Sequence, residues 1–457
     1  MKINQITAAL LSLGLISAAN VAKADTQIVL TSNGQTYNVV YITGSTAARP
    51  NVFNAVTNGV FDQTPPTLQP TTASGSTSQY NAIGTIGGVN YIISADFTGS
   101  EAGLGALQHF TTDPTILQNP NTASSLPGYS SGTVYLPGTP NPSFINPNNT
   151  SQTAAAQADL SMADTSQAVS LTAPPAYTAL KNWGIVGVVP FEWVKATNSA
   201  PDSSWTDLVN VTDPQLNFAL GSVQAASFFT GNANDSDSVY LIGRNKGSGT
   251  RVNCMLDTLH GVTSAVNQYC AGNAAYNGSG AITNGSSSVT LKVAGGIVAL
   301  GNDGFDSGSG VSGTLSMDVN GTTDTYGQIM TIGYLGISDG NTAAGNHATR
   351  LTLNGVPEND ATVINGTYSF WGHEHLYSTP SPDSTVTTVA EQLVGANANS
   401  SPNQSLGSGS TAAGAIESKG GLGGNEVNTS TTQSTIIDPK AMAADKASGD
   451  AGYPSQI

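Results

Sequence analysis

Three segments of the chain each join a hydrophobic strand to a turn of small residues and the start of a helix. They span residues 39–46, 91–100 and 239–250, and each turn contains glycine with serine or threonine. The amino end of a helix carries unpaired N–H groups and about half a positive charge, and glycine lets a ligand approach the backbone. One such turn is an ordinary helix cap, whereas three suggest convergence on one oxyanion.

An arginine strengthens the third turn as an anion site. Arg244 lies four residues before Ser248, in the segment Arg244-Asn245-Lys246-Gly247-Ser248-Gly249-Thr250. A guanidinium at this spacing can donate two hydrogen bonds to the anion that the turn would hold. Apolar residues recur at helical spacing after each turn, which predicts that each turn leads into an amphipathic helix.

These segments resemble the ligand loops of a known family, the phosphate-binding proteins of phosphate ABC transporters. Residues 244–250 are similar to the family's Arg-x-Asp-Gly-Ser-Gly-Thr loop, although Lys246 stands where the family has an acidic residue. Similar motifs follow the family's order at residues 43–46, 98–103, 159–164, 301–304, 332–334 and 365–368. The resemblance extends over residues 37–377.

The resemblance implies an α/β fold of the two-lobed type II periplasmic-binding class, with hinge strands and long surface insertions. Lobe 1 would comprise residues 25–185 with 366–396, and lobe 2 residues 186–365. The implied ligand-binding residues are Ser45, Thr46, Ser100, Asp164, Arg244, Ser248, Gly249 and Thr250. Because Lys246 and Ala47 depart from the family pattern, another oxyanion or a phosphorylated compound stays open as the ligand.

Residues 1–24 predict a signal peptide. An apolar run at residues 6–19 follows Lys2 and is too short to span a bilayer, and Ala22-Lys23-Ala24 fits a small-x-small cleavage site. We expect the mature chain to begin at Asp25, to lack a membrane span and to be periplasmic or secreted.

The formal net charge of -16 disfavours binding to nucleic acid or an anionic membrane through a basic face. The protein can still bind an anion, because helix dipoles and one arginine set the local potential while distant charges are screened within about 10 Å. Only 9% of the residues are charged and 52 are glycine, which is typical of secreted or envelope proteins.

Two cysteines, Cys254 and Cys270, are present. In an oxidising compartment they predict a disulfide that ties the helix after the third turn to the following loop. Their spacing lacks the Cys-x-x-Cys pairs of a zinc site. His373-Glu374-His375 offers two imidazoles without an evident third ligand, so we expect neither a metal nor a cofactor.

Hydrophobic residues at 185–189 and 329–335 predict buried parallel strands. Residues 112–157, 273–290 and 305–325 predict surface insertions, because they are rich in small polar residues. Residues 397–457 form a C-terminal extension whose Gly/Ser/Asn-rich part, 397–437, is predicted to be mobile, and residues 441–447 have the option of a short helix.

Three functions fit these features. The favoured one is an exported protein that captures phosphate between two lobes, either for an ABC importer or to concentrate it in the envelope. The second is a phosphomonoesterase on the same scaffold, although neither a nucleophile with an adjacent base nor a two-metal carboxylate cluster is visible. The third is a surface or matrix protein that keeps the fold without tight binding.

Overall fold

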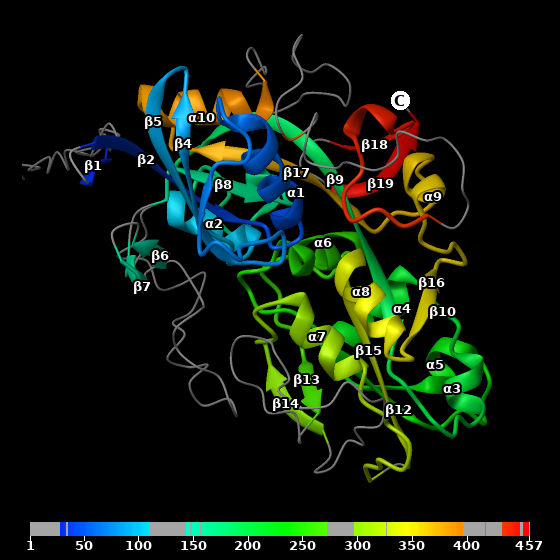
Figure 1. Ribbon diagram of the computed structural model, residues 1–457. Helices are drawn as coiled ribbons and strands as arrows, with labels where there is room; N and C mark the ends of the chain where they lie inside the picture. The colour runs from blue at the N-terminus through cyan, green and yellow to red at the C-terminus, as the bar shows by residue number, and fades with distance from the viewer. Residues whose placement is uncertain are drawn as a thin grey trace, which may run out of the picture.

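The protein is a mixed α/β protein built on one large sheet with helices packed against it (Figure 1). The predicted α/β class is therefore confirmed. The predicted signal peptide and residues 273–290 lie outside the residues that the computed structural model describes. Those residues are 28–32, 35–108, 143–146, 149–155, 158–271, 297–325, 327–395, 416, 432–447 and 451–456.

The sheet has 13 strands in two halves that share two central strands. The first half contains β1 Ile28–Ser32, β2 Gln35–Gly44, β3 Thr67–Gln69, β4 Gln79–Ile86, β5 Val89–Asp96 and β8 Leu160–Ala163. The second half contains β10 Asn210–Val211, β11 Gln224–Ala225, β12 Ser238–Ile242, β15 Ile329–Gly336 and β16 Thr349–Leu353. The shared strands are β9 Lys181–Lys195 and β17 Trp371–Ser378. Figure 1 shows the two halves as two lobes, with β9 running between them.

Among the described residues, three two-stranded antiparallel sheets are separate from this sheet. They are β6 Ser143–Asn146 with β7 Asn149–Ala155, β13 Gln268–Ala271 with β14 Ile297–Gly301, and β18 Ala444–Ala447 with β19 Ala451–Gln456. The first of them is the described part of the predicted insertion at residues 112–157.

Strand β9 connects the two lobes. Its residues 181–190 pair with β17, and its residues 191–195 pair with β15. Almost all of β9 from Trp183 onward is buried, which agrees with its apolar sequence from Trp183 to Phe191. The predicted buried strands at 185–189 and 329–335 are thus confirmed as parts of β9 and β15.

The predicted parallel direction is confirmed for β15 and wrong for β9. Strand β15 is parallel to β12, whereas β9 is antiparallel to β15, β16 and β17. Strand β9 carries the chain from lobe 1 to lobe 2, and β17 carries it back beside β9. The two strands are therefore antiparallel. Burial on both faces produces the same apolar sequence in either direction, so the sequence pattern did not distinguish them.

The helices expected after the three turns are present. They are α1 Arg49–Ala55, α2 Ser100–Leu107 and α6 Gly249–Asp257, and a π-helical turn, Val56–Val60, continues α1. The other α-helices are α3 Ser203–Asp207, α4 Asp213–Gly221, α5 Ala226–Thr230, α7 Gly308–Leu315, α8 Ile337–Gly345, α9 Asp360–Ile364 and α10 Ser384–Val394.

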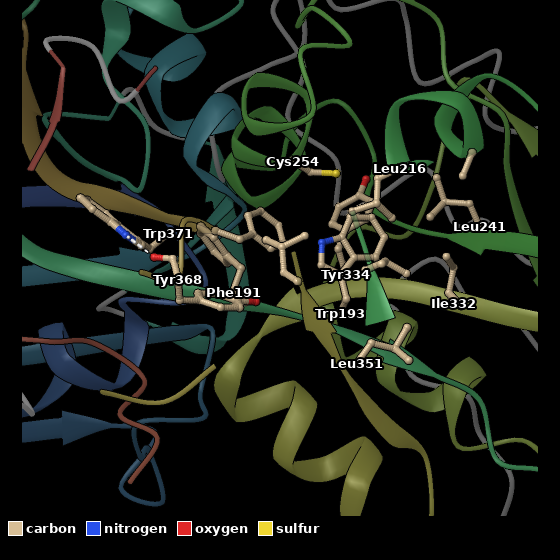
Figure 2. Packing of buried hydrophobic residues seen from close by; sticks show 14 of the residues in the cluster. Phe191, Trp193, Leu216, Leu241, Cys254, Ile332, Tyr334, Leu351, Tyr368 and Trp371 are labelled. Atoms are coloured by element: carbon tan, nitrogen blue, oxygen red, sulfur yellow. Dashed lines mark hydrogen bonds between the residues drawn. The ribbon is translucent and has the colours of Figure 1, made fainter. Parts of the chain in front are cut away.

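Each lobe has its own apolar core. In lobe 1, α1 and α10 cover the sheet, and residues such as Val52 and Val389 are fully buried with Ile42. In lobe 2, Trp193 of β9 packs edge-on against Tyr334 of β15, with ring centroids 5.4 Å apart (Figure 2). This second cluster continues through Phe191 to Trp371, so it reaches the strands that join the lobes.

Residues 305–325 are not the surface insertion that their composition predicts. They contain α7, and Phe305, Val311, Leu315, Met317 and Val319 are buried in one apolar cluster. Glycines let this helix pack closely on two sides: a Cβ on Gly333 of β15 would lie 3.1 Å from Leu315, and a Cβ on Gly308 of α7 would lie 1.9 Å from the Asp339 carboxylate of α8. At least one of the small residues that suggested a loop, Gly308, therefore serves close helix packing.

The predicted disulfide is also wrong. Cys254 and Cys270 are free, buried thiols. Cys254 lies on α6 in the core around Trp193 (Figure 2), whereas Cys270 lies on β13 in the cluster around Phe305. Burial raises the pKa of the Cys270 thiol to about 11 and that of Cys254 well above its usual value. The two thiols serve separate cores as small apolar groups.

Part of the C-terminal extension packs on the core rather than being mobile. We call residues 432–447 the strap. Ile436 and Ile437 are buried, and Ile437 exchanges two backbone hydrogen bonds with Val188 of β9, at 2.8 and 2.9 Å. Gly187 of β9 leaves space for the Ile436 side chain, because a Cβ at position 187 would lie 2.3 Å from that side chain. Residues 441–447 form the end of a 3-10 turn and strand β18 instead of a helix.

Two buried carboxyl groups meet the strap at Gln433. Glu192 accepts a hydrogen bond from Arg350 Nε at 2.7 Å, and Glu358 accepts one from Gln433 Nε2. Burial raises the pKa of Glu192 to about 7 and that of Glu358 to about 8. The carboxyl groups of Glu192 and Asp360 raise the pKa of Glu358 further, while Gln433 and Arg350 lower it.

Glu358→Gln should therefore stabilise the protein above neutral pH. Between the unfolded pKa of 4.5 and the folded pKa of about 8, the native state holds a proton that the unfolded state releases, so stability falls as pH rises through this window. Glu358→Gln removes this pH-dependent loss. Its free energy of unfolding should exceed that of the parent by on the order of 3 kcal/mol at pH 8, and by little at pH 4.5.

Urea unfolding at the two pH values measures the effect. Glu391→Gln, on the exposed face of α10, is the control and should show no comparable pH-dependent gain. A Glu358→Gln gain that is equal at both pH values would contradict the expectation.

Candidate functional site

The first turn packs the end of β2 against β8. Gly44 has φ +113°, and a Cβ there would lie 1.9 Å from the Met162 carbonyl oxygen, so this position requires glycine. Ser45 N donates to that same carbonyl at 2.8 Å, and Ser45 Oγ accepts from Ala48 N at 3.3 Å. Ser45 thus holds the turn before α1, whose N-cap residue is Ala48, and Thr46 next to it is partly exposed.

The second turn lies directly against the first. Gly99 N donates to the Gly44 carbonyl at 2.8 Å. Within α2, a Cβ on Gly103 would lie 2.7 Å from Gly44 Cα, so the helix sits tightly on the first turn. The starts of α1 and α2 are therefore held side by side.

The third turn, from lobe 2, reaches the start of α2. The Gly247 carbonyl accepts hydrogen bonds from Glu101 N at 3.1 Å and Ala102 N at 3.2 Å. A Cβ on Gly99 would lie 2.5 Å from that carbonyl oxygen. Ser248 Oγ caps α6 by accepting from Arg251 N at 3.4 Å. The contact joins the lobes, and it uses two of the N–H groups that α2 would otherwise offer to an anion.

Asp164 joins the second and third turns. Ser100 Oγ donates to Asp164 Oδ1 at 2.6 Å, and Asp164 is 2% exposed. A Cβ on Gly249 would lie 1.6 Å from the same carboxylate oxygen, so the backbone of the third turn touches it. Asn253 Nδ2 donates to the backbone carbonyls of both Asp164 and Gly249, at 2.8 and 3.1 Å. Three predicted site residues from separate segments thus meet.

Several donors at this junction have no hydrogen-bond partner among the residues that the structure describes. We call this set the donor cluster. It comprises Arg244 Nη1 and the backbone N–H groups of Thr46, Ala47, Ser100, Gly249 and Thr250. Thr46 and Ala47 are partly exposed, whereas the other four residues of the cluster are buried. Buried N–H groups are nearly always paired, so these buried donors suit an anion.

Arg244 is held in place by carbonyl groups and is only 3% exposed. Its Nε donates to the Phe305 carbonyl at 3.3 Å, and its Nη2 to the Asp306 carbonyl at 2.9 Å. These bonds leave Nη1 available and orient the guanidinium. Arg244 therefore supplies the positive charge expected from the sequence. Because the guanidinium is buried, its attraction for an anion is stronger than it would be in water.

Two carboxyl groups near the site were missed from the sequence. Burial raises the pKa of Asp339 on α8, while the charges of Arg244 and Arg49 lower it. Burial raises the pKa of Glu101 to about 7, hydrogen bonds from Leu171 and Thr165 lower it, and the adjacent Asp164 raises it again. Asp339 had no local signal, whereas Glu101 follows Ser100 directly and was detectable as a buried acid in a helix start.

Two basic residues near the third turn have structural partners. Arg251 is buried, and its guanidinium donates to the Arg244 carbonyl at 3.2 Å and to Asn302 Oδ1 at 2.7 Å. Burial lowers the pKa of Lys246, Arg251 lowers it further, and Asp303 raises it. Lys246 thus has an acidic neighbour of its own in place of the acidic residue expected at its position.

The two histidines of the 373–375 segment have separate partners. His373 Nε2 lies 3.1 Å from Asp445 Oδ1, and His375 Nδ1 lies 3.2 Å from Asn182 Nδ2. Among the described residues, no group of three or more His, Cys, Asp or Glu is placed to hold a metal ion. In the same part of the chain, no helix has the length and hydrophobicity needed to cross a membrane.

Fold and site together define a two-lobed α/β protein with a donor cluster where the lobes meet. No protein-family model and no curated protein matches the chain. Among solved structures, it is similar to a putative phosphate ABC transporter substrate-binding protein with bound phosphate from Clostridium perfringens. The identity is 13%, over 78% of this chain and 92% of that chain, with a TM-score of 0.36.

Two further structures show a similar degree of likeness. An ABC-type phosphate transport receptor from Vibrio cholerae is 12% identical over 76% of this chain and 90% of that chain, with a TM-score of 0.35. PstS from Borrelia burgdorferi is 12% identical over 77% of this chain and 91% of that chain, with a TM-score of 0.32. Similarity at this level does not identify a ligand for this chain.

Proposed function

We propose that this chain is an exported solute-binding protein that captures phosphate between its two lobes for an ABC-type importer. The observation that carries the proposal is the donor cluster beside Asp164. Its donors come from both lobes: Thr46, Ala47 and Ser100 from lobe 1, and Arg244, Gly249 and Thr250 from lobe 2. An anion that accepted from both sets would hold the lobes together.

Phosphate suits this site better than a fully deprotonated anion. Near pH 7 phosphate is negative and still carries a proton, so it can accept from the donor cluster and donate to a carboxylate. Asp164 contacts two residues of the cluster, Ser100 and Gly249. The hydroxyls of Ser45, Thr46, Ser248 and Thr250 complete the proposed ligand set.

Export and the lobe boundaries are part of the same proposal. Residues 1–24 would be removed, residues 25–185 with 366–396 would form lobe 1, and residues 186–365 lobe 2. Release of the mature chain into the periplasm or the medium would place it where it can meet external phosphate.

Calorimetric titration of the purified protein with phosphate tests the function. We expect one phosphate per chain and a higher unfolding temperature with phosphate, because a ligand that binds only the native state stabilises it. Absence of both binding heat and thermal stabilisation at millimolar phosphate would overturn the proposal. Hydrolysis of a chromogenic phosphate ester by the same preparation would favour a phosphomonoesterase instead.

A further inference from the structure

The strap ends in a buried lysine that contacts both lobes. The Lys446 side chain is 0% exposed. Its Nζ donates to Asp257 Oδ1 at 2.8 Å, to Asp257 Oδ2 at 3.0 Å and to the Trp371 carbonyl at 2.6 Å. All three N–H donors of the ammonium group thus have acceptors. A buried lysine is tolerated under this condition.

The two partners of Lys446 are connected to the donor cluster. Asp257 is the last residue of α6, and Gly249 and Thr250 are the first. A carboxylate at the carboxyl end of a helix is repelled by the helix dipole, so the lysine charge offsets a local instability. Because α6 is one continuous helix of nine residues, holding its last residue also restrains the direction of its first N–H groups.

Trp371, the second partner of Lys446, is the first residue of β17, which contacts Asp164. The next residue, Gly372, would place a Cβ 2.4 Å from the Asp164 carbonyl oxygen and 2.7 Å from the Asn253 amide. Strand β17 therefore touches Asp164 one residue beyond the carbonyl that Lys446 holds. Figure 2 shows Trp371 and α6, marked by Cys254, on neighbouring elements.

We propose that Lys446 is a positioning residue for the anion site. By joining the end of α6 to β17, it fixes the start of α6 against Asp164. The C-terminal strap is then a working part of the binding site, although it lies outside the lobes predicted from the sequence. The effect on ligand affinity rests on the proposed function, whereas the effect on α6 does not.

The test compares four proteins: the parent, K446M, the double variant D257N/K446M, and K440M. K446M removes the ammonium group from the buried Asp257 carboxylate, so it can lower the fraction of folded protein. D257N/K446M removes both charges, so no buried charge opposes folding. It still removes the ion pair that joins the strap to the end of α6. Lys440 is an exposed lysine of the same strap, and K440M is the matched control.

We expect faster hydrogen exchange at amides 252–257 in D257N/K446M than in the parent and K440M. We also expect the phosphate Kd of the folded double variant to rise by about tenfold, since a less preorganised site binds more weakly. Parent-like exchange in α6 together with parent-like Kd would overturn the proposal, as would a lower unfolding temperature with no change in Kd.

The exchange measurement separates this inference from the proposed function. A parent protein that binds no phosphate refutes the function. In that case exchange in α6 still decides whether Lys446 holds the helix, and unchanged exchange refutes the positioning role.

Discussion

Arg244→Ala is expected to weaken phosphate binding by about 2–5 kcal/mol, because it removes a buried charge-assisted donor. The guanidinium is 3% exposed and is oriented by the Phe305 and Asp306 carbonyls. Its loss leaves the charge of the anion less compensated, and it also removes the two hydrogen bonds from the guanidinium to the Phe305 and Asp306 carbonyls. Calorimetric titration with phosphate, alongside a thermal melt of the unliganded variant, measures the loss.

Arg49→Ala is the control for Arg244. Arg49 lies at the start of α1 and is partly exposed, and its guanidinium donates to the Gly75 carbonyl at 3.2 Å and to Ser78 Oγ at 2.9 Å. Its removal should cost less affinity. Arg251 is unsuitable as a control, because its buried guanidinium ties α6 to Asn302. An Arg244→Ala protein that binds phosphate like the parent would show that the proposed ligand set is wrong at its central residue.

Asp164→Asn is expected to change the choice between phosphate and sulfate. The Asp164 carboxylate can accept a hydrogen bond from protonated phosphate, whereas it repels sulfate, which has no proton to donate. The amide removes the repulsion and supplies a donor. Sulfate affinity should rise relative to phosphate affinity by roughly tenfold or more, since a buried like-charge contact costs at least about 1.4 kcal/mol.

Competition titrations of both anions at fixed ionic strength measure this ratio. Asp62→Asn is the control, because Asp62 is an exposed carboxylate that accepts hydrogen bonds from Gly87 N and Gly88 N far from the site in the sheet. If the phosphate-to-sulfate ratio in Asp164→Asn equals that of the parent, Asp164 is a structural partner of Ser100 and does not select the ligand.

The helix starts of the candidate site were predictable because capping is local. Glycine with serine or threonine at the end of a strand favours a helix start close by, and Ser248 caps α6 directly. The helices at Arg49, Ser100 and Gly249 accordingly begin at the predicted turns. The buried strands β9 and β15 were predictable for a similar reason, since burial on both faces requires an unbroken apolar sequence.

The misplaced features depend on contacts between distant residues. Residues 305–325 suggested a loop because their glycines and serines are locally ambiguous, and only the contact of α7 with Asp339 of α8 shows why Gly308 is a glycine. The cysteine count suggested a disulfide, but the two thiols face different apolar clusters. Composition made residues 397–437 appear mobile, although Ile436 and Ile437 pack against β9.

By itself, the sequence determined the α/β class, the three helix starts and the residue types that can hold an oxyanion, because these follow from local backbone chemistry and apolar periodicity. Tertiary structure decided which donors remain unpaired, since the Gly247 carbonyl takes two N–H groups of α2 and leaves that of Ser100. It also decided that Lys446 meets Asp257, 189 residues away in the chain. Such pairings depend on how the strands cross between the lobes, and no local pattern encodes that path.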